Sequence, residues 1–181
     1  MVTVGAIGYP VVLGIQKTGT ASSSVVADTD FGPLTKNDRD FVAEVHAAGL
    51  LELPAGRLAL KKGTTGDVRA AGQRLVNADV SLDATCRKVA TRLDVTLPDK
   101  LSLQQQALLT AMTDDRGRKF DSDFANILWT ANSRLLPRIA DIRTTTRNTL
   151  IRQLADQADT SVLDHMTTLE KTGRVDYDQA P

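Results

Sequence analysis

Residues 64–93 read TTGDVRAAGQRLVNADVSLDATCRKVATRL, and this stretch decides the fold class of the chain. An apolar residue recurs every three or four positions, which is the spacing of one face of an α-helix. The positions on this face are Val68, Ala71, Leu75, Asp79, Leu82, Cys86, Val89 and Leu93. Thr64 with Asp67 is typical of a helix start. The stretch therefore predicts a long amphipathic helix that turns one carboxylate, Asp79, toward the core.

The preceding stretch predicts another long helix. Thr35 and Asp38 resemble a capping box, and Gly63 follows the last residue of the helical pattern. Pro54 lies inside the pattern, and we expect it to kink or restart the helix because proline has no backbone N–H. Since the turn from Gly63 to Gly66 is short, the first two helices should be antiparallel neighbours.

A second pair of long helices is predicted in the C-terminal half, and a shorter helix precedes it. The three predicted helices cover residues 102–116, 121–142 and 150–173. Pro137 lies inside the middle one, and a second kink is expected there. We therefore predict an all-α, ferritin-like four-helix bundle over residues 35–176, in which a long crossover with a short extra helix joins two antiparallel helical hairpins. Residues 177–181 would form a tail.

Composition and charge exclude several classes of function. Lys plus Arg and Asp plus Glu are 22 each, so the chain lacks the basic excess that is typical of nucleic-acid binders. Only 4% of the residues are aromatic, which argues against stacking platforms for bases or sugars. Cys86 is the single cysteine and lies on the predicted core face, where a small buried hydrophobe is expected. No nucleophile motif or phosphate-binding loop is found, so no catalytic or cofactor-binding residue is predicted.

The N-terminal segment, residues 1–34, has a different composition. Residues 2–15 are almost wholly apolar, and residues 16–24 are small and polar. The apolar run is shorter than the ~20 residues that span a bilayer, and no basic residue precedes it. Two interpretations remain: the end of a signal or anchor helix followed by a flexible linker, or a loose strand or docking arm. The first predicts a secreted or membrane-anchored, extracytoplasmic protein.

Each long predicted helix places one polar side chain where the apolar pattern requires a core residue. These residues are Glu52, Asp79, Asn132 and His165. Carboxylate and imidazole groups suit a hard or borderline divalent cation, so Glu52, Asp79 and His165 form a candidate metal site. Asn132 is a polar core residue and a weak ligand. The alternative is a buried cluster whose groups satisfy one another by hydrogen bonds.

Two observations limit the metal interpretation. The chain contains no Glu-x-x-His pair, the arrangement that ferritin-like di-iron proteins use. His46, the other histidine, lies beside the predicted core face rather than on it, so we expect it to be partly exposed. No cofactor is therefore expected, and a divalent metal is the one candidate.

Four stretches of the chain resemble a known family. They are AGLLELPAGRLALKKG (48–63), LVNADVSLDATCRKVATRLDVTLPDK (75–100), FDSDFANILWTANSRLLPRIADIR (120–143) and SVLDHMTTLEKTG (161–173). In order and spacing they are similar to the domain-of-unknown-function 4142 family, especially its actinobacterial members, over about residues 33–177. The resemblance implies a ferritin-like bundle that is exported or membrane-anchored.

The resemblance also bears on the polar core. Its pattern implies a histidine in the second long helix and another in the third, at the positions that Asp79 and Asn132 occupy here. Glu52 and His165 match the pattern. The resemblance thus implies that any metal site of the family is altered in this chain.

Three functions are compatible with the sequence. The first is a non-catalytic extracytoplasmic module with a degenerate polar core, which packs against a protein partner or the envelope. The second is a metal-binding ferritin-like protein that uses Glu52, Asp79 and His165. The third is a small-ligand binder with a cavity between the helices near Pro54 and Pro137.

Overall fold

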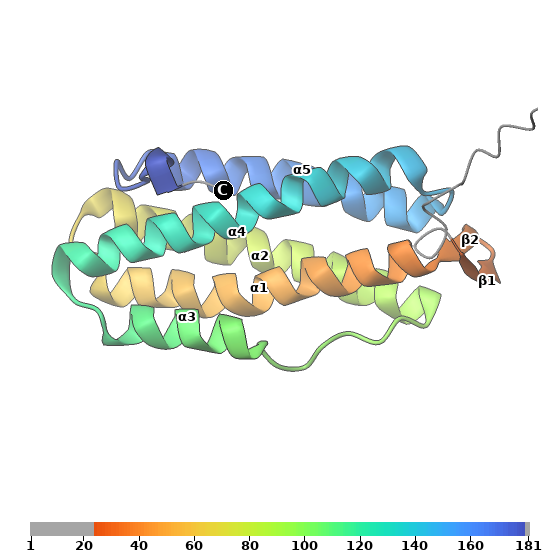
Figure 1. The fold of residues 1–181 in the computed structure, drawn as a ribbon, viewed down its shortest axis with the longest axis horizontal. Coiled ribbons are helices and arrows are strands. Elements are labelled where there is room, and N and C mark those ends of the chain that lie inside the picture. The colour runs from red at the N-terminus through yellow and green to blue at the C-terminus, as the bar shows by residue number, and fades with distance from the viewer. Residues whose placement is uncertain (1–23, 180–181) are drawn as a thin grey trace, which may run out of the picture.

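Four long helices lie side by side in the computed structural model of the protein, which describes residues 24–179 (Figure 1). They are α1 (Lys36–Lys62), α2 (Gly66–Leu93), α4 (Gly117–Thr145) and α5 (Thr149–Glu170). Helices α1 and α2 form one antiparallel hairpin, and α4 and α5 form the other. The predicted all-α bundle of two helical hairpins is confirmed.

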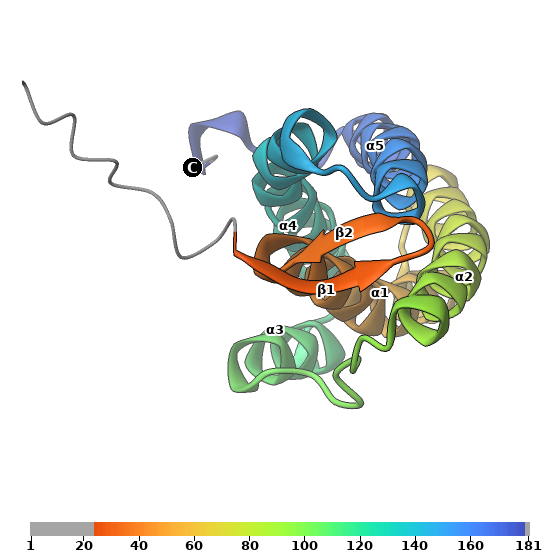
Figure 2. The same cartoon turned by 90° about the vertical axis from the view of Figure 1, so that its right-hand side faces the viewer.

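The connection between the two hairpins is long and returns along the whole bundle. It contains α3 (Leu103–Asp114) and brings the chain back to the end at which α2 began, so α4 runs in the same direction as α2 (Figure 1). Helix α3 packs on α1 and α4 and lies outside the group of four (Figure 2). One long crossover is the connectivity of ferritin-like bundles.

The helix starts follow local capping rules, with one shift. The predicted capping box at Thr35 is present, and a second capping box is found at Ser102. Helix α2 is capped by Thr65, whose hydroxyl accepts from the Val68 N–H, and not by Thr64. The Thr64 hydroxyl instead donates to the carboxylate of Asp121. The Thr64 cap was therefore wrong by one residue, because this threonine joins the turn to a distant helix.

Both internal prolines are accommodated within continuous helices. Helix α1 runs through Pro54, so the restart considered for this position is not found, and α4 runs through Pro137. The core beside them is packed, since Ala55 and Ile139 are fully buried. The ligand cavity proposed near the two prolines stays a prediction.

A short β hairpin, which the sequence analysis did not predict, precedes α1. Strand β1 (Val25–Thr29) pairs antiparallel with β2 (Gly32–Thr35), and the hairpin covers one end of the bundle (Figure 2). Leu34 is fully buried in the core. The amide of Asn148, the N-cap of α5, donates to Thr29 Oγ1 and to the Gly32 carbonyl at 3.1 Å each. These bonds attach part of the segment assigned to the linker to the bundle.

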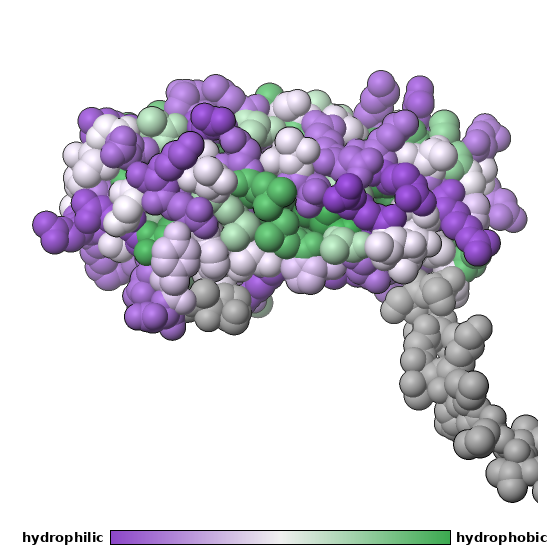
Figure 3. Space-filling model, turned by 90° about the horizontal axis from the view of Figure 1, so that it is seen from above, coloured by the Kyte–Doolittle hydropathy of each residue, from purple (hydrophilic) through white to green (hydrophobic). Residues whose placement is uncertain are grey.

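The apolar run at residues 2–15 lies outside the described residues. Within residues 24–179, no helix combines the length and the apolar character that a membrane crossing requires. The face above α4 and α5 is mostly hydrophilic, with an apolar patch near its centre (Figure 3). The bundle therefore presents a mixed surface on this side.

Helices α1 and α2 approach each other closely at two glycines, Gly56 and Gly72. A Cβ atom added at Gly72 would lie 2.6 Å from the Gly56 carbonyl oxygen and 2.7 Å from Ala59 Cβ. A Cβ atom added at Gly56 would lie 2.9 Å from the Gly72 carbonyl oxygen. Real Cβ atoms do not pack at these distances, so any side chain here would push the helices apart. Together the two glycines set the close packing of the hairpin that carries Glu52 and Asp79.

We expect Gly72→Ala to destabilise the protein although alanine is the better helix former. Overpacking of a tight contact costs about 1–3 kcal/mol, which exceeds the gain of up to about 1 kcal/mol from helix propensity. Gly49→Ala is the matched control, because a Cβ atom at Gly49 meets nothing within 4 Å. The control should gain about 0.5–1 kcal/mol. Urea denaturation followed by circular dichroism measures both, and equal stability of the two variants would contradict the close contact.

Candidate functional site

The four polar residues predicted to face the core all do so, at the middle of the bundle. Glu52 on α1, Asp79 on α2, Asn132 on α4 and His165 on α5 are each at most 3% exposed. Each occupies a position in the helical repeat that apolar residues hold in the adjoining turns. The helix phase therefore explains why one polar side chain from every long helix points into the core.

Asn132 holds Glu52 in position. Its side-chain amide donates to Glu52 Oε1 at 2.7 Å and to the Leu128 carbonyl, one turn earlier on α4, at 2.9 Å. The amide thus joins α1 to α4 through one carboxylate oxygen. The second oxygen of that carboxylate, Oε2, remains for another partner.

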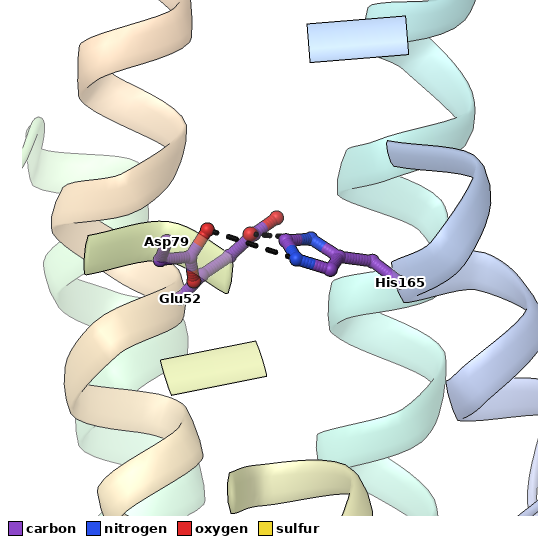
Figure 4. A group of neighbouring side chains, drawn as sticks. All are labelled: Glu52, Asp79 and His165. Atoms are coloured by element: carbon purple, nitrogen blue, oxygen red, sulfur yellow. Dashed lines mark ion pairs between the residues drawn. The ribbon is translucent and has the colours of Figure 1, made fainter. Parts of the chain in front are cut away.

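The imidazole of His165 faces both carboxylates, which lie next to each other on one side of the ring (Figure 4). Its Nδ1 is 3.1 Å from Glu52 Oε2, and its Nε2 is 3.9 Å from Asp79 Oδ1. Neither nitrogen has a hydrogen-bond partner among residues 24–179, and Asp79 Oδ2 has none either. Hydrogen bonds among its own members therefore satisfy the cluster only in part, because three of its side-chain atoms have no hydrogen-bond partner within that range.

Asp79 is the electrostatically strained member of the cluster. Burial, followed by the nearby negative charge of Glu52 and a side-chain hydrogen bond to Glu52, raises the pKa of Asp79 to about 10, and the charge of Asp83 adds to the effect. Without a cation, this carboxyl group is held neutral at physiological pH. A positive charge placed between the carboxylates would favour the ionised form instead.

The three side chains come close enough to share one ion. Glu52, Asp79 and His165 each offer a ligand atom, and these atoms lie within 4.8 Å of one another. Ligands bound to one ion at about 2.0–2.2 Å lie roughly 3.3–4.4 Å apart, so side-chain shifts of about 1 Å would form a complete set. The structure therefore brings together the three side chains of the candidate metal site.

His46 was predicted to be partly exposed, and this was wrong. It is 3% exposed, and its Nδ1 donates to Asp83 Oδ1 on α2 at 2.7 Å. The second oxygen of Asp83 accepts from Arg87 Nε at 2.7 Å. The pairing of His46 with Asp83 could have been predicted from the sequence. The two residues are equally far from the turn between Gly63 and Gly66, so antiparallel helices place them opposite each other.

A small cavity of about 10 Å³ separates this pair from the polar cluster. The residues that line it are Val45, His46, Gly49, Asp79, Leu82, Asp83 and Cys86. Cys86 is fully buried, as predicted, and its thiol donates to the Val42 carbonyl. Burial raises the pKa of this thiol to about 12, so it stays protonated. The cavity has room for about one water molecule.

Comparison with known proteins gives one match. Residues 24–172 match the profile of the family described as Domain of unknown function (DUF4142). No curated protein and no solved structure was found to match the chain. The matched residues include the hairpin, all five helices and every member of the polar cluster. The chain therefore belongs to the DUF4142 family.

Proposed function

We propose that this protein binds one divalent metal ion in the middle of its helical bundle, through Glu52, Asp79 and His165. One observation carries the proposal: three ligand-type side chains from three helices converge in the core, and three of their polar atoms have no hydrogen-bond partner among the described residues. Buried polar atoms without partners destabilise a protein. An ion bound between them would satisfy these atoms and offset the repulsion between the carboxylates.

The ligand set favours a hard or borderline transition metal. Two carboxylates and one imidazole suit Mn²⁺, Fe²⁺, Co²⁺ or Zn²⁺, whereas Cu⁺ prefers sulfur ligands and Ca²⁺ takes six to eight oxygens. Asn132 then acts outside the ligand set. By donating to Glu52 it orients the carboxylate, which is the usual role of a group that supports a metal ligand.

The surroundings of the cluster support a non-catalytic role. The three side chains are buried, and the cavity that Asp79 lines has a volume of about 10 Å³. Catalytic metal sites keep an open position for substrate, and an organic substrate does not fit a space of this size. We therefore propose that the ion is held or stored and does not act on an organic substrate.

Thermal unfolding in the presence of metal tests the proposal. A ligand at 100 times its Kd stabilises the folded state by about 2.7 kcal/mol, which corresponds to an increase in Tm of roughly 5–10 °C for a domain of this size. We expect this increase with at least one of Mn²⁺, Co²⁺ or Zn²⁺, relative to protein in EDTA. Elemental analysis after dialysis should give one ion per chain.

Glu52→Gln should abolish the increase in Tm, and Glu44→Gln provides the matched control. Glu44 lies on the same helix, but it is exposed and pairs with Arg138 at 2.8 Å. The control should respond to metal like the wild type. A wild-type protein that shows no shift with any of these ions would contradict the proposal, as would an equal loss of the shift in both variants.

We also propose that the bundle is an extracytoplasmic module that contacts a protein partner or the envelope. The apolar composition of residues 2–15 supports export or anchoring, and the apolar patch above α4 and α5 offers a contact surface (Figure 3). Fractionation of cells that express the full gene tests this proposal. Recovery in the cytoplasmic fraction alone would contradict it.

A further inference from the structure

A second polar group lies next to the proposed metal site and is not needed to bind the ion. It consists of His46 on α1 and Asp83 on α2, and it shares the small cavity with Asp79. We propose that this pair forms the route by which the cation reaches the core, and that His46 holds the ion transiently before it passes to Asp79. This inference rests on the proposed metal-binding function.

The burial of the side chains along the cavity defines the direction of the route. The Asp83 side chain is 24% exposed, whereas those of His46 and Asp79 are 2% exposed. All three line the same cavity between α1 and α2. A cation that meets Asp83 at the surface therefore has a continuous series of polar groups leading to the core. Residues elsewhere around the cavity are apolar or small.

Asp83 prepares His46 to act as a ligand. Because the Asp83 carboxylate accepts the hydrogen of His46 Nδ1, the neutral ring carries its lone pair on Nε2. No partner is found for Nε2 within the part of the chain that the structure describes. Asp83 is thus a positioning residue, and its other oxygen is held by Arg87. An Asp–His pair of this kind is the usual arrangement behind a metal-binding imidazole.

At the inner end of the cavity, Asp79 also has an atom that a bound ligand could contact. Asp79 is buried to 2% exposure, and its Oδ2 has no partner among residues 24–179. Gly49 leaves the wall of the cavity open, because a Cβ atom there would meet nothing within 4 Å. A larger side chain at position 49 could therefore narrow the route without touching the proposed ligands.

A residue on the entry route and a residue that binds the ion have different effects on the kinetics of metal binding. A residue that only guides the ion changes the rates of binding and release equally, and the Kd stays the same. A residue that remains bound to the ion changes the Kd. Rates and affinity measured on the same variants therefore separate the two roles.

The experiment uses the full chain and Co²⁺, whose visible absorption reports the environment of the ion. Stopped-flow mixing gives the association rate, chelator chase gives the dissociation rate, and titration gives the Kd. We expect His46→Ala and Gly49→Leu to slow both rates about tenfold or more, with the Kd within about threefold of wild type. Circular dichroism confirms that each variant is folded. Gly49→Leu keeps the test valid if His46→Ala does not fold.

Asp83→Asn should also slow binding, and Asp40→Asn is its matched control. Both substitutions remove one negative charge, but Asp40 is exposed on α1 and pairs with Lys36. Equal slowing in both would indicate general electrostatic attraction and would contradict the route.

Unchanged rates of metal binding in His46→Ala and Gly49→Leu would also contradict the route, while the proposed function would stand. A large increase in Kd for His46→Ala would make His46 a ligand and contradict the relay. If Co²⁺ does not bind wild type but another ion does, the same measurements are made with that ion by competition.

Discussion

Asp79→Asn is expected to stabilise the metal-free protein and to abolish its response to metal. Asparagine keeps the shape of aspartate and cannot ionise, so it removes the energetic cost of a carboxyl group that burial and Glu52 hold neutral. At neutral pH, we expect the free energy of unfolding to rise by about 1–4 kcal/mol. At about 2–4 °C per kcal/mol for a domain of this size, the corresponding increase in Tm is roughly 2–16 °C.

The same pKa shift sets the sign of the pH dependence. The folded protein holds the Asp79 proton up to about pH 10, whereas the unfolded chain releases it near the ordinary value of 3.8. Folded protein therefore binds more protons between these limits, and the contribution of Asp79 to stability falls as the pH rises from about 4 toward 10. The metal-free wild type should lose stability relative to Asp79→Asn over this range.

Differential scanning calorimetry in EDTA measures both effects, and Asp40→Asn is the control. Asp40 is an exposed acid on α1, and its substitution should change the Tm little. A drop in stability for Asp79→Asn would show that the carboxylate is ionised and well paired in the folded protein. That outcome would contradict the inference that Asp79 is neutral in the metal-free protein and needs a cation to ionise.

Such a gain in stability would itself indicate function. Residues that destabilise the folded state are retained where binding or activity requires them. A buried carboxyl group with an unpartnered oxygen is of this kind. If the Asp79→Asn variant is more stable than the wild type, metal binding explains the presence of aspartate at position 79, and folding does not.

Helix periodicity was sufficient to predict most of the fold and the members of the cluster. Glu52, Asp79, Asn132 and His165 each replace an apolar residue in a regular pattern, so their inward direction follows from helix geometry. The short turn after Gly63 made α1 and α2 neighbours. The periodicity could not give the rotation of one hairpin against the other, which decides whether the four groups meet.

Features that depend on pairing between helices were missed. His46 lies beside the core face of α1, and it is buried only because α2 presents Asp83 opposite to it. The hairpin before α1 was missed because its strands are short and only one of its residues, Leu34, is fully buried. Both depend on contacts between segments far apart in the chain, which a single-helix pattern does not record.

The resemblance implied a degenerate site, and the geometry gives each altered position a role. Asp79 still offers a ligand atom within reach of Glu52 and His165. Asn132 instead orients Glu52 through a hydrogen bond. A set of one imidazole and two carboxylates differs from a set with more histidines mainly in preferring harder ions. In the proposed site, Asp79 therefore acts as a ligand and Asn132 as the group that orients Glu52.

Metal affinity should rise steeply with pH, because the ion must displace the proton of Asp79. With a pKa of about 10 in the metal-free protein, this carboxyl group is protonated throughout the range near neutrality. Each ion bound then releases one proton from it, so the association constant should rise about tenfold per pH unit between roughly pH 7.5 and 9.5.

Isothermal titration calorimetry checks the proton release directly. When the same titration is run in buffers of different ionisation enthalpy, the observed heat should vary with a slope near one proton per ion, and competition with a chelator gives the affinity at each pH. Because Glu44→Gln changes only an exposed acid, it should reproduce the wild-type slope. An affinity that does not change with pH would mean that Asp79 is already ionised before the ion arrives. The cluster would then attract the cation as two charged carboxylates, and the stabilising effect of Asp79→Asn should disappear with it.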